Sequence, residues 1–212
     1  TMLAINRAAF TTRNLLSKKI EQVFDRPTQF VVRSPRYIKA TKQNLSATVD
    51  LSGTSNKQGI TPDQILEAQI TGGTRSLKRF ERALIHVGAM RSNQAAVPGS
   101  AAKIDQYGNM SAGQIVQILS WFKKSGEGSM SDKGRGSRKK GTLGFQFFAI
   151  QKKYGKLLPG VYQRIAFAGG RTAVKPVLIF VSRRPSYKMK FDFYGYGEDR
   201  AYDEFQKEFP IA

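Results

Sequence analysis

FQFFAI at residues 145–150, VYQRIAF at 161–167 and VLIFV at 177–181 are the three stretches that decide the fold class. Each is short and rich in β-branched and aromatic residues, and turns rich in glycine, proline and basic residues separate them, as is typical of successive strands. Amphipathic helices are expected before and after them in the chain. We therefore predict an α+β fold, with a mostly antiparallel sheet packed against amphipathic helices and with helices near both ends of the chain.

Hydrophobic residues recur at helical spacing in much of the remaining chain. Thr61, Pro62 and Asp63 form a helix start, because a capping residue is followed by proline in the first turn and by an acid near the positive end of the helix dipole. Gly72 and Gly73 are expected to bend or break the helical run that follows. Helices are predicted over residues 2–24, from 61, over 75–86, from a capping box at 111–114 and over 199–209, and two further short strands at 29–33 and 47–51.

The length of 212 residues suits one domain of ordinary size, so we expect a single α+β domain over residues 1–212. Within it, residues 125–141 alternate glycine with basic residues and have little to bury. We predict a flexible Gly/Lys/Arg-rich loop there.

The charge of the chain is strongly basic and unevenly distributed. Lysine and arginine number 35 against 15 carboxylates, a net charge of +20. Residues 133–191 hold 15 basic side chains and no acidic one, whereas residues 192–212 hold 2 basic and 6 acidic side chains. A stretch without carboxylates cannot neutralise itself, so it faces water, nucleic acid or an acidic protein surface. The candidate residues for contact with DNA or a partner are Lys133, Arg135, Arg138, Lys139 and Lys140.

The sequence gives no support for catalysis, for a cofactor or for a metal site. The chain has no cysteine and one histidine, His86, which is expected at a helix end on the surface. It also lacks the glycine-rich motifs that bind nucleotides. A nuclease holding Mg²⁺ would need several converging carboxylates, and the isolated candidates are Asp50, Asp63, Asp105 and Asp192. We therefore predict a protein that is not an enzyme. No run of about 20 apolar residues predicts a membrane span.

Aromatic residues near both ends of the chain have two interpretations. They either close the core or form a subunit interface, where aromatic side chains are enriched. The candidate interface residues are Phe10, Phe24, Phe193, Tyr194 and Tyr202.

Seven blocks of sequence, spread over nearly the whole chain, carry a resemblance to known proteins. They are AINRAA at 4–9, VFDRPT at 23–28, ATK at 40–42, LKRFE at 77–81, AVPG at 96–99, DQYGNMSAGQIVQIL at 105–119 and VKPVLIFV at 174–181. With these blocks the chain resembles a group of prophage-encoded virion proteins of tailed phages, the minor tail protein Z and tail-completion (neck) group.

The resemblance implies a structural component of the phage virion at the neck or tail, assembled in the host cytoplasm. Proteins of this kind form rings, commonly of six or twelve copies, that join the portal or its adaptor to the tail around the DNA channel. The implied partners are other copies of the chain, portal, adaptor or tail proteins, and the phage genomic DNA. The alternative is a sequence-independent nucleic-acid-binding protein that uses the basic region 133–191, and a third hypothesis, an enzyme such as a nuclease, has no motif in its support.

Overall fold

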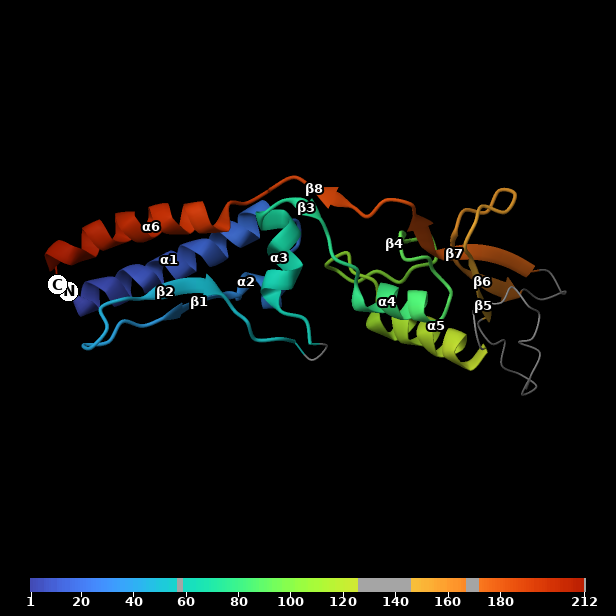
Figure 1. Ribbon diagram of the computed structural model, residues 1–212, viewed down its shortest axis with the longest axis horizontal. Helices are drawn as coiled ribbons and strands as arrows, with labels where there is room; N and C mark the ends of the chain where they lie inside the picture. Colours follow the sequence, from blue (N-terminus) through green and yellow to red (C-terminus); the bar gives the residue numbers. More distant parts are fainter. Residues whose placement is uncertain (57–58, 126–145, 167–171, 212) are drawn as a thin grey trace. The chain divides into compact units, whose positions relative to one another are not determined.

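The computed structural model of the protein describes residues 1–56, 59–125, 146–166 and 172–211 (Figure 1). Their contacts group into two compact units. Unit 1 comprises Thr1–Arg75 and Ser186–Ala212, and unit 2 comprises Ser76–Pro185. The sequence predicts one domain over residues 1–212, and that the two units fold as one domain stays a prediction.

Two long helices form the frame of unit 1. α1 (Met2–Val23) and α6 (Phe193–Glu208) lie side by side and antiparallel, since Arg7 pairs with Glu208 while Leu16 lies against Gly197 (Figure 1). α1 buries the small residues Ala4 and Ala8, which let a neighbouring backbone approach closely. A short 3₁₀ turn, η2 (Phe209–Ile211), follows α6.

The rest of unit 1 packs around this pair. β1 (Pro35–Ile38) and β2 (Thr48–Leu51) pair antiparallel, with Pro35 opposite Leu51 and Ile38 opposite Thr48. β3 (Gly73–Thr74) pairs antiparallel with β8 (Ser186–Tyr187), and Gly72 and Gly73 take the positive φ values of +76° and +99° that glycine tolerates. The remaining helices are α2 (Gln29–Val32) and α3 (Pro62–Ile70). The buried core consists of Leu16, Ile20, Val31, Val32, Leu66, Ile70, Phe191 and Phe193.

Unit 2 is a four-stranded antiparallel sheet with two helices. The strand order is β4 (Ala95–Pro98), β7 (Thr172–Val181), β6 (Gly160–Ala166) and β5 (Gln146–Ile150). α4 (Arg79–His86) and α5 (Ala112–Ser125) pack on one face of this sheet. The core that they share with the strands includes Leu84, Ile118, Phe122, Phe147, Val161, Leu178 and Phe180.

The α+β class predicted from the sequence is confirmed, as are most of the individual elements. Two predictions were wrong. Residues 29–33 are not a strand but contain the short helix α2, because Val31 and Val32 are adjacent and both buried, which an alternating strand with one buried face does not allow. The last helix begins at Phe193 rather than 199, since the Asp192 side chain accepts a hydrogen bond from the Gly195 N–H (2.9 Å).

The predicted capping box at 111–114 is also corrected. The Gln114 amide instead accepts a hydrogen bond from the Lys103 N–H (2.7 Å) and donates one to the Ala101 carbonyl (3.0 Å). Gln114 therefore fastens the loop that precedes α5. The predicted flexible loop at 125–141 lies outside the described residues, except for Ser125 at the end of α5. No helix in the described part of the chain has the length and hydropathy needed to cross a membrane.

Candidate functional site

The five basic residues predicted as contacts, Lys133, Arg135, Arg138, Lys139 and Lys140, lie outside the described residues. Residues 76–185, which form unit 2, contain 20 lysines and arginines against 4 carboxylates, so this unit has a net charge of +16 out of the chain's +20.

The charged side chains on the described surface of unit 2 are almost all cationic. Thirteen of its lysines and arginines have described side chains, and all thirteen are exposed. Of the two carboxylates with described side chains, Glu81 is fully buried. The other, Asp105, is exposed and accepts hydrogen bonds from the N–H groups of Tyr107 (2.9 Å) and Asn109 (2.8 Å). Exposed lysines and arginines on this described surface therefore outnumber exposed carboxylates by thirteen to one.

The sheet topology brings six of these cations to one end of the sheet. Ile150 at the end of β5 pairs with Gly160 at the start of β6, and Gly160 pairs with Ile179 near the end of β7. Ala95 at the start of β4 pairs with Val181. The segments that follow β5 and β7 and precede β4 therefore meet at the same end. Their exposed basic residues, which we name the cationic end, are Arg91, Lys152, Lys153, Lys156, Arg183 and Arg184.

Hydrogen bonds fasten the segments that carry the cationic end. Tyr154 and Leu157 exchange backbone hydrogen bonds of 3.0 and 2.9 Å, which makes the β5–β6 connection a tight turn. The Tyr162 hydroxyl donates a hydrogen bond to the Leu158 carbonyl (2.9 Å), and burial raises the pKa of this hydroxyl, which favours its protonated, donating form. The Arg184 guanidinium, in the segment after β7, donates a hydrogen bond to the carbonyl of Ser92, in the segment before β4 (3.4 Å).

The face of the sheet opposite α4 and α5 carries a stacked row of side chains. The rings of Phe148 and Tyr162 stack with their centroids 5.6 Å apart, and the Arg164 guanidinium lies 5.1 Å from the Phe148 ring. Tyr162 is 3% exposed, so its ring packs in the protein and is not offered to a nucleobase. Phe147 likewise packs inside the protein, because it is buried against Trp121 on the other face.

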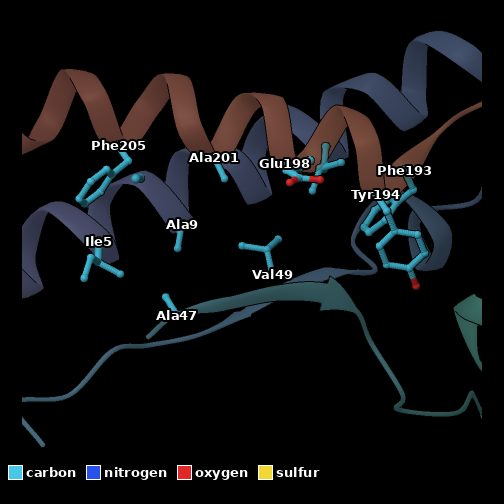
Figure 2. A pocket seen from close by; sticks show the side chains of 12 residues that line it. Ile5, Ala9, Ala47, Val49, Phe193, Tyr194, Glu198, Ala201 and Phe205 are labelled. Atoms are coloured by element: carbon cyan, nitrogen blue, oxygen red, sulfur yellow. The ribbon is translucent and has the colours of Figure 1, made fainter. Parts of the chain in front are cut away.

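Unit 1 contains an apolar groove of about 460 Å³ between α1, α6 and β2. Figure 2 shows Ile5, Ala9 and Val49 around this space, with Phe205 towards one end and Tyr194 towards the other. The pKa of the Tyr194 hydroxyl is raised, first by partial burial of the hydroxyl and then by the negative charge of Asp50. The groove thus offers an apolar floor with few polar groups.

The predicted interface residues fall into three groups. Phe10, Tyr194 and Tyr202 are 50%, 58% and 65% exposed, so they can contact another molecule. Phe24 is half-buried against the core of unit 1. Phe193 is only 1% exposed and its ring packs against Phe191, so it is a core residue and its assignment to an interface is corrected.

The residues considered for catalysis divide between the two units. Asp50, Asp63 and Asp192 belong to unit 1, whereas Asp105 and His86 belong to unit 2, where His86 is exposed at the end of α4. Among the described residues, no group of three or more histidines or carboxylates is placed to hold a metal ion.

The cationic end was not singled out as a site from the sequence. Lys152 and Lys153 directly follow one predicted strand, and Arg183 and Arg184 directly follow another. In an antiparallel sheet the ends of alternate strands meet at one edge, so basic residues after strands 145–150 and 177–181 were the available signal. Comparisons with protein-family models, curated proteins and solved structures found no match for this chain.

Proposed function

We propose that the protein is a non-enzymatic structural subunit of a tailed-phage virion, located at the neck or tail and assembled with copies of itself into a ring around the DNA channel. The support comes from the seven sequence blocks that resemble the tail-completion group. The contacts of these blocks inside the fold fit a structural role.

Three pairs of blocks contact each other directly. The Asn6 amide donates to the Ala40 carbonyl (3.1 Å) and accepts from the Ala40 N–H (2.8 Å), which ties α1 to the chain after β1. The buried Glu81 carboxylate accepts from the Ala96 N–H (2.8 Å) at the edge strand β4. The Gly99 N–H donates to the Val177 carbonyl (2.9 Å) on β7. The first of these contacts connects elements within unit 1, and the other two connect elements within unit 2.

Exposed aromatic side chains of unit 1 support contacts between copies. Phe10 and Tyr202 are both at least half exposed, and the apolar groove lies between the helices that carry them and β2. Aromatic side chains of this kind are enriched at interfaces and supply much of their binding energy.

We expect the purified protein to form a ring whose mass is a multiple of 23.6 kDa. Tyr202→Ser should weaken its assembly about fivefold or more, because a buried interface tyrosine contributes more than about 1 kcal/mol. Mass photometry over a concentration series measures this. Tyr154→Ser, which removes a similarly exposed tyrosine from unit 2, is the matched control. A protein that stays monomeric alone and with its neighbouring virion proteins, and is absent from purified particles, would contradict the proposal.

A second function, sequence-independent binding of nucleic acid, is favoured by one observation, the nearly complete absence of exposed carboxylates on the described surface of unit 2. We expect the full chain to bind DNA of unrelated sequences with similar affinity and with strong salt dependence. Replacing Arg135, Arg138, Lys139 and Lys140 with alanine should reduce the salt slope by about one for each lost phosphate contact. Fluorescence anisotropy across a salt series measures both, and absence of binding at low salt would exclude this function.

A further inference from the structure

We propose that the cationic end of the unit 2 sheet binds the phosphate backbone of double-stranded DNA. This inference rests on the proposed nucleic-acid-binding function. It narrows the basic region 133–191 to residues that were not among the five candidate contacts at 133–140, and it adds Arg91. The residues are Arg91, Lys152, Lys153, Lys156, Arg183 and Arg184, all exposed at one end of four paired strands.

The dimensions of this end suit a duplex. Neighbouring strands lie about 4.8 Å apart, so the end of four strands is roughly 15 Å wide. Double-stranded DNA carries one phosphate charge per about 1.7 Å of its axis, so a length equal to that width carries roughly nine phosphate charges on its two strands, and about half of them face one surface. The six lysines and arginines there are therefore comparable in number to the phosphates that face this end. No carboxylate lies in the three described segments that carry these six residues, so nothing in them competes with phosphate.

The framework under these cations is ordered before a ligand arrives. The turn closed by Tyr154 and Leu157 and the hydrogen bond from Tyr162 to Leu158 hold the segment that carries the three lysines. The Gln151 amide donates to the Gly88 carbonyl and fastens the start of the same segment to the chain after α4. Binding therefore has to order only the side chains, which reduces the entropic cost of association.

An acidic surface on a second copy fits this end less well than DNA does. The most acidic part of the chain is α6, and three of its carboxylates are already paired within unit 1: Glu208 with Arg7 (3.4 Å), Glu204 with Lys207 (2.7 Å) and Asp203 with Arg200 (3.0 Å). Glu198 and Asp199 are its other exposed carboxylates and make no ion pair among the described residues. Two such charges cannot match six cations.

The described strands expose no aromatic platform on which bases could stack, which agrees with backbone contact. Tyr162 is packed under the β5–β6 connection, and Phe148 is covered by Arg164 and Tyr162. Tyr154, at 68% exposed, is the one strongly exposed aromatic side chain of the described segments at this end. A surface of this kind holds phosphates and does not select a sequence.

The test uses the full-length protein with alanine at Lys152, Lys153, Lys156 and Arg183. Arg184 is left in place because it holds the Ser92 carbonyl. Affinity for a labelled duplex is measured by fluorescence anisotropy across a salt series. We expect the slope of log K against log salt to fall by about 3 to 4, since each lost phosphate contact removes about 0.9.

The matched control removes four exposed cations from unit 1, by alanine at Lys18, Arg36, Lys39 and Lys42, and has the same net charge as the test variant. We expect its slope to stay within about one unit of the wild-type slope. A second variant with arginine at the three lysines should keep the wild-type slope, and circular dichroism checks that each variant is folded.

The outcomes separate this inference from the proposed function. If the wild-type protein binds duplex DNA and the test variant keeps the wild-type slope while the variant at residues 135–140 loses it, the cationic end is not the site, although nucleic-acid binding stands. Equal losses in the test and control variants would show a general charge effect and overturn the inference. Tighter binding to single strands than to the duplex would also overturn it. Absence of any binding at low salt would exclude both the nucleic-acid-binding function and its assignment to the cationic end.

Discussion

Replacing Glu81 with alanine is expected to lower the free energy of unfolding by about 3 to 5 kcal/mol. Glu81 is fully buried in α4, and its two carboxylate oxygens accept hydrogen bonds from the N–H groups of Lys78 (2.7 Å) and Ala96 (2.8 Å). Alanine removes both acceptors and leaves the N–H of the buried residue Ala96 without this partner. The change also opens a cavity where the carboxylate stood. Urea unfolding followed by circular dichroism measures the loss.

The isosteric variant Glu81→Gln is the control for shape. It keeps one acceptor oxygen but turns the other into a donor that faces an N–H group, so we expect an intermediate loss. Glu67→Ala on α3 of unit 1 is the control for removing a glutamate from a helix, and its effect should stay within about 0.5 kcal/mol. A loss below about 1 kcal/mol for Glu81→Ala would show that the carboxylate does not hold α4 to β4.

Elements with clear local signals in the sequence could be predicted, whereas elements and side-chain roles that depend on tertiary contacts could not. The helices with clear periodicity and an end signal were predicted well: the helix over 2–24 is α1, and the helix start at Thr61–Asp63 is the start of α3. Gln29–Val32 was misassigned as part of a strand. The preference of β-branched residues for strands is weak, and tertiary packing can override it. Here Val31 and Val32 are both needed in the core beside α1.

Side-chain roles were harder to predict than elements. Phe193 and Tyr194 are neighbours in the sequence, and both were interpreted as interface residues. The first turn of α6 points Phe193 into the core and leaves Tyr194 exposed, a distinction that depends on where the helix starts. Glu81 was one of several acidic residues on helices, and nothing in the local sequence distinguishes a buried acceptor from a solvated one.

The cationic end depends on topology in the same way. Arg91, the lysines at 152–156 and the arginines at 183–184 are far apart in the sequence, and only the strand order β4-β7-β6-β5 brings their segments to one end. Composition identified the excess of charge, and periodicity identified the strands. The missing step was the pairing order, which depends on long-range contacts that no local pattern records.

The second large effect concerns Gly160, at the start of β6 where the connection that carries Lys152, Lys153 and Lys156 rejoins the sheet. A Cβ at this position would overlap the carbonyl oxygen of Leu178, its neighbour on β7. The overlapped oxygen belongs to the backbone of β7, which pairs with β6, so it cannot move without disturbing the β6–β7 ladder. We expect Gly160→Ala to cost about 2 to 3 kcal/mol of unfolding free energy.

Gly113→Ala provides the matched control within the same unit. Gly113 lies in the first turn of α5, and a Cβ there would meet nothing closer than the Ser111 hydroxyl at 3.7 Å. Since alanine loses less backbone entropy than glycine in a helix, this variant should be neutral or more stable by up to about 1 kcal/mol. Thermal and urea unfolding of the two variants compare the same added methyl group at two sites. Equal stabilities would mean that β6 and β7 do not approach as closely as described.

If Gly160→Ala also flattens the salt slope of DNA binding while remaining folded, the effect would follow from displacement of the adjoining lysine segment, because the substitution itself removes no charge.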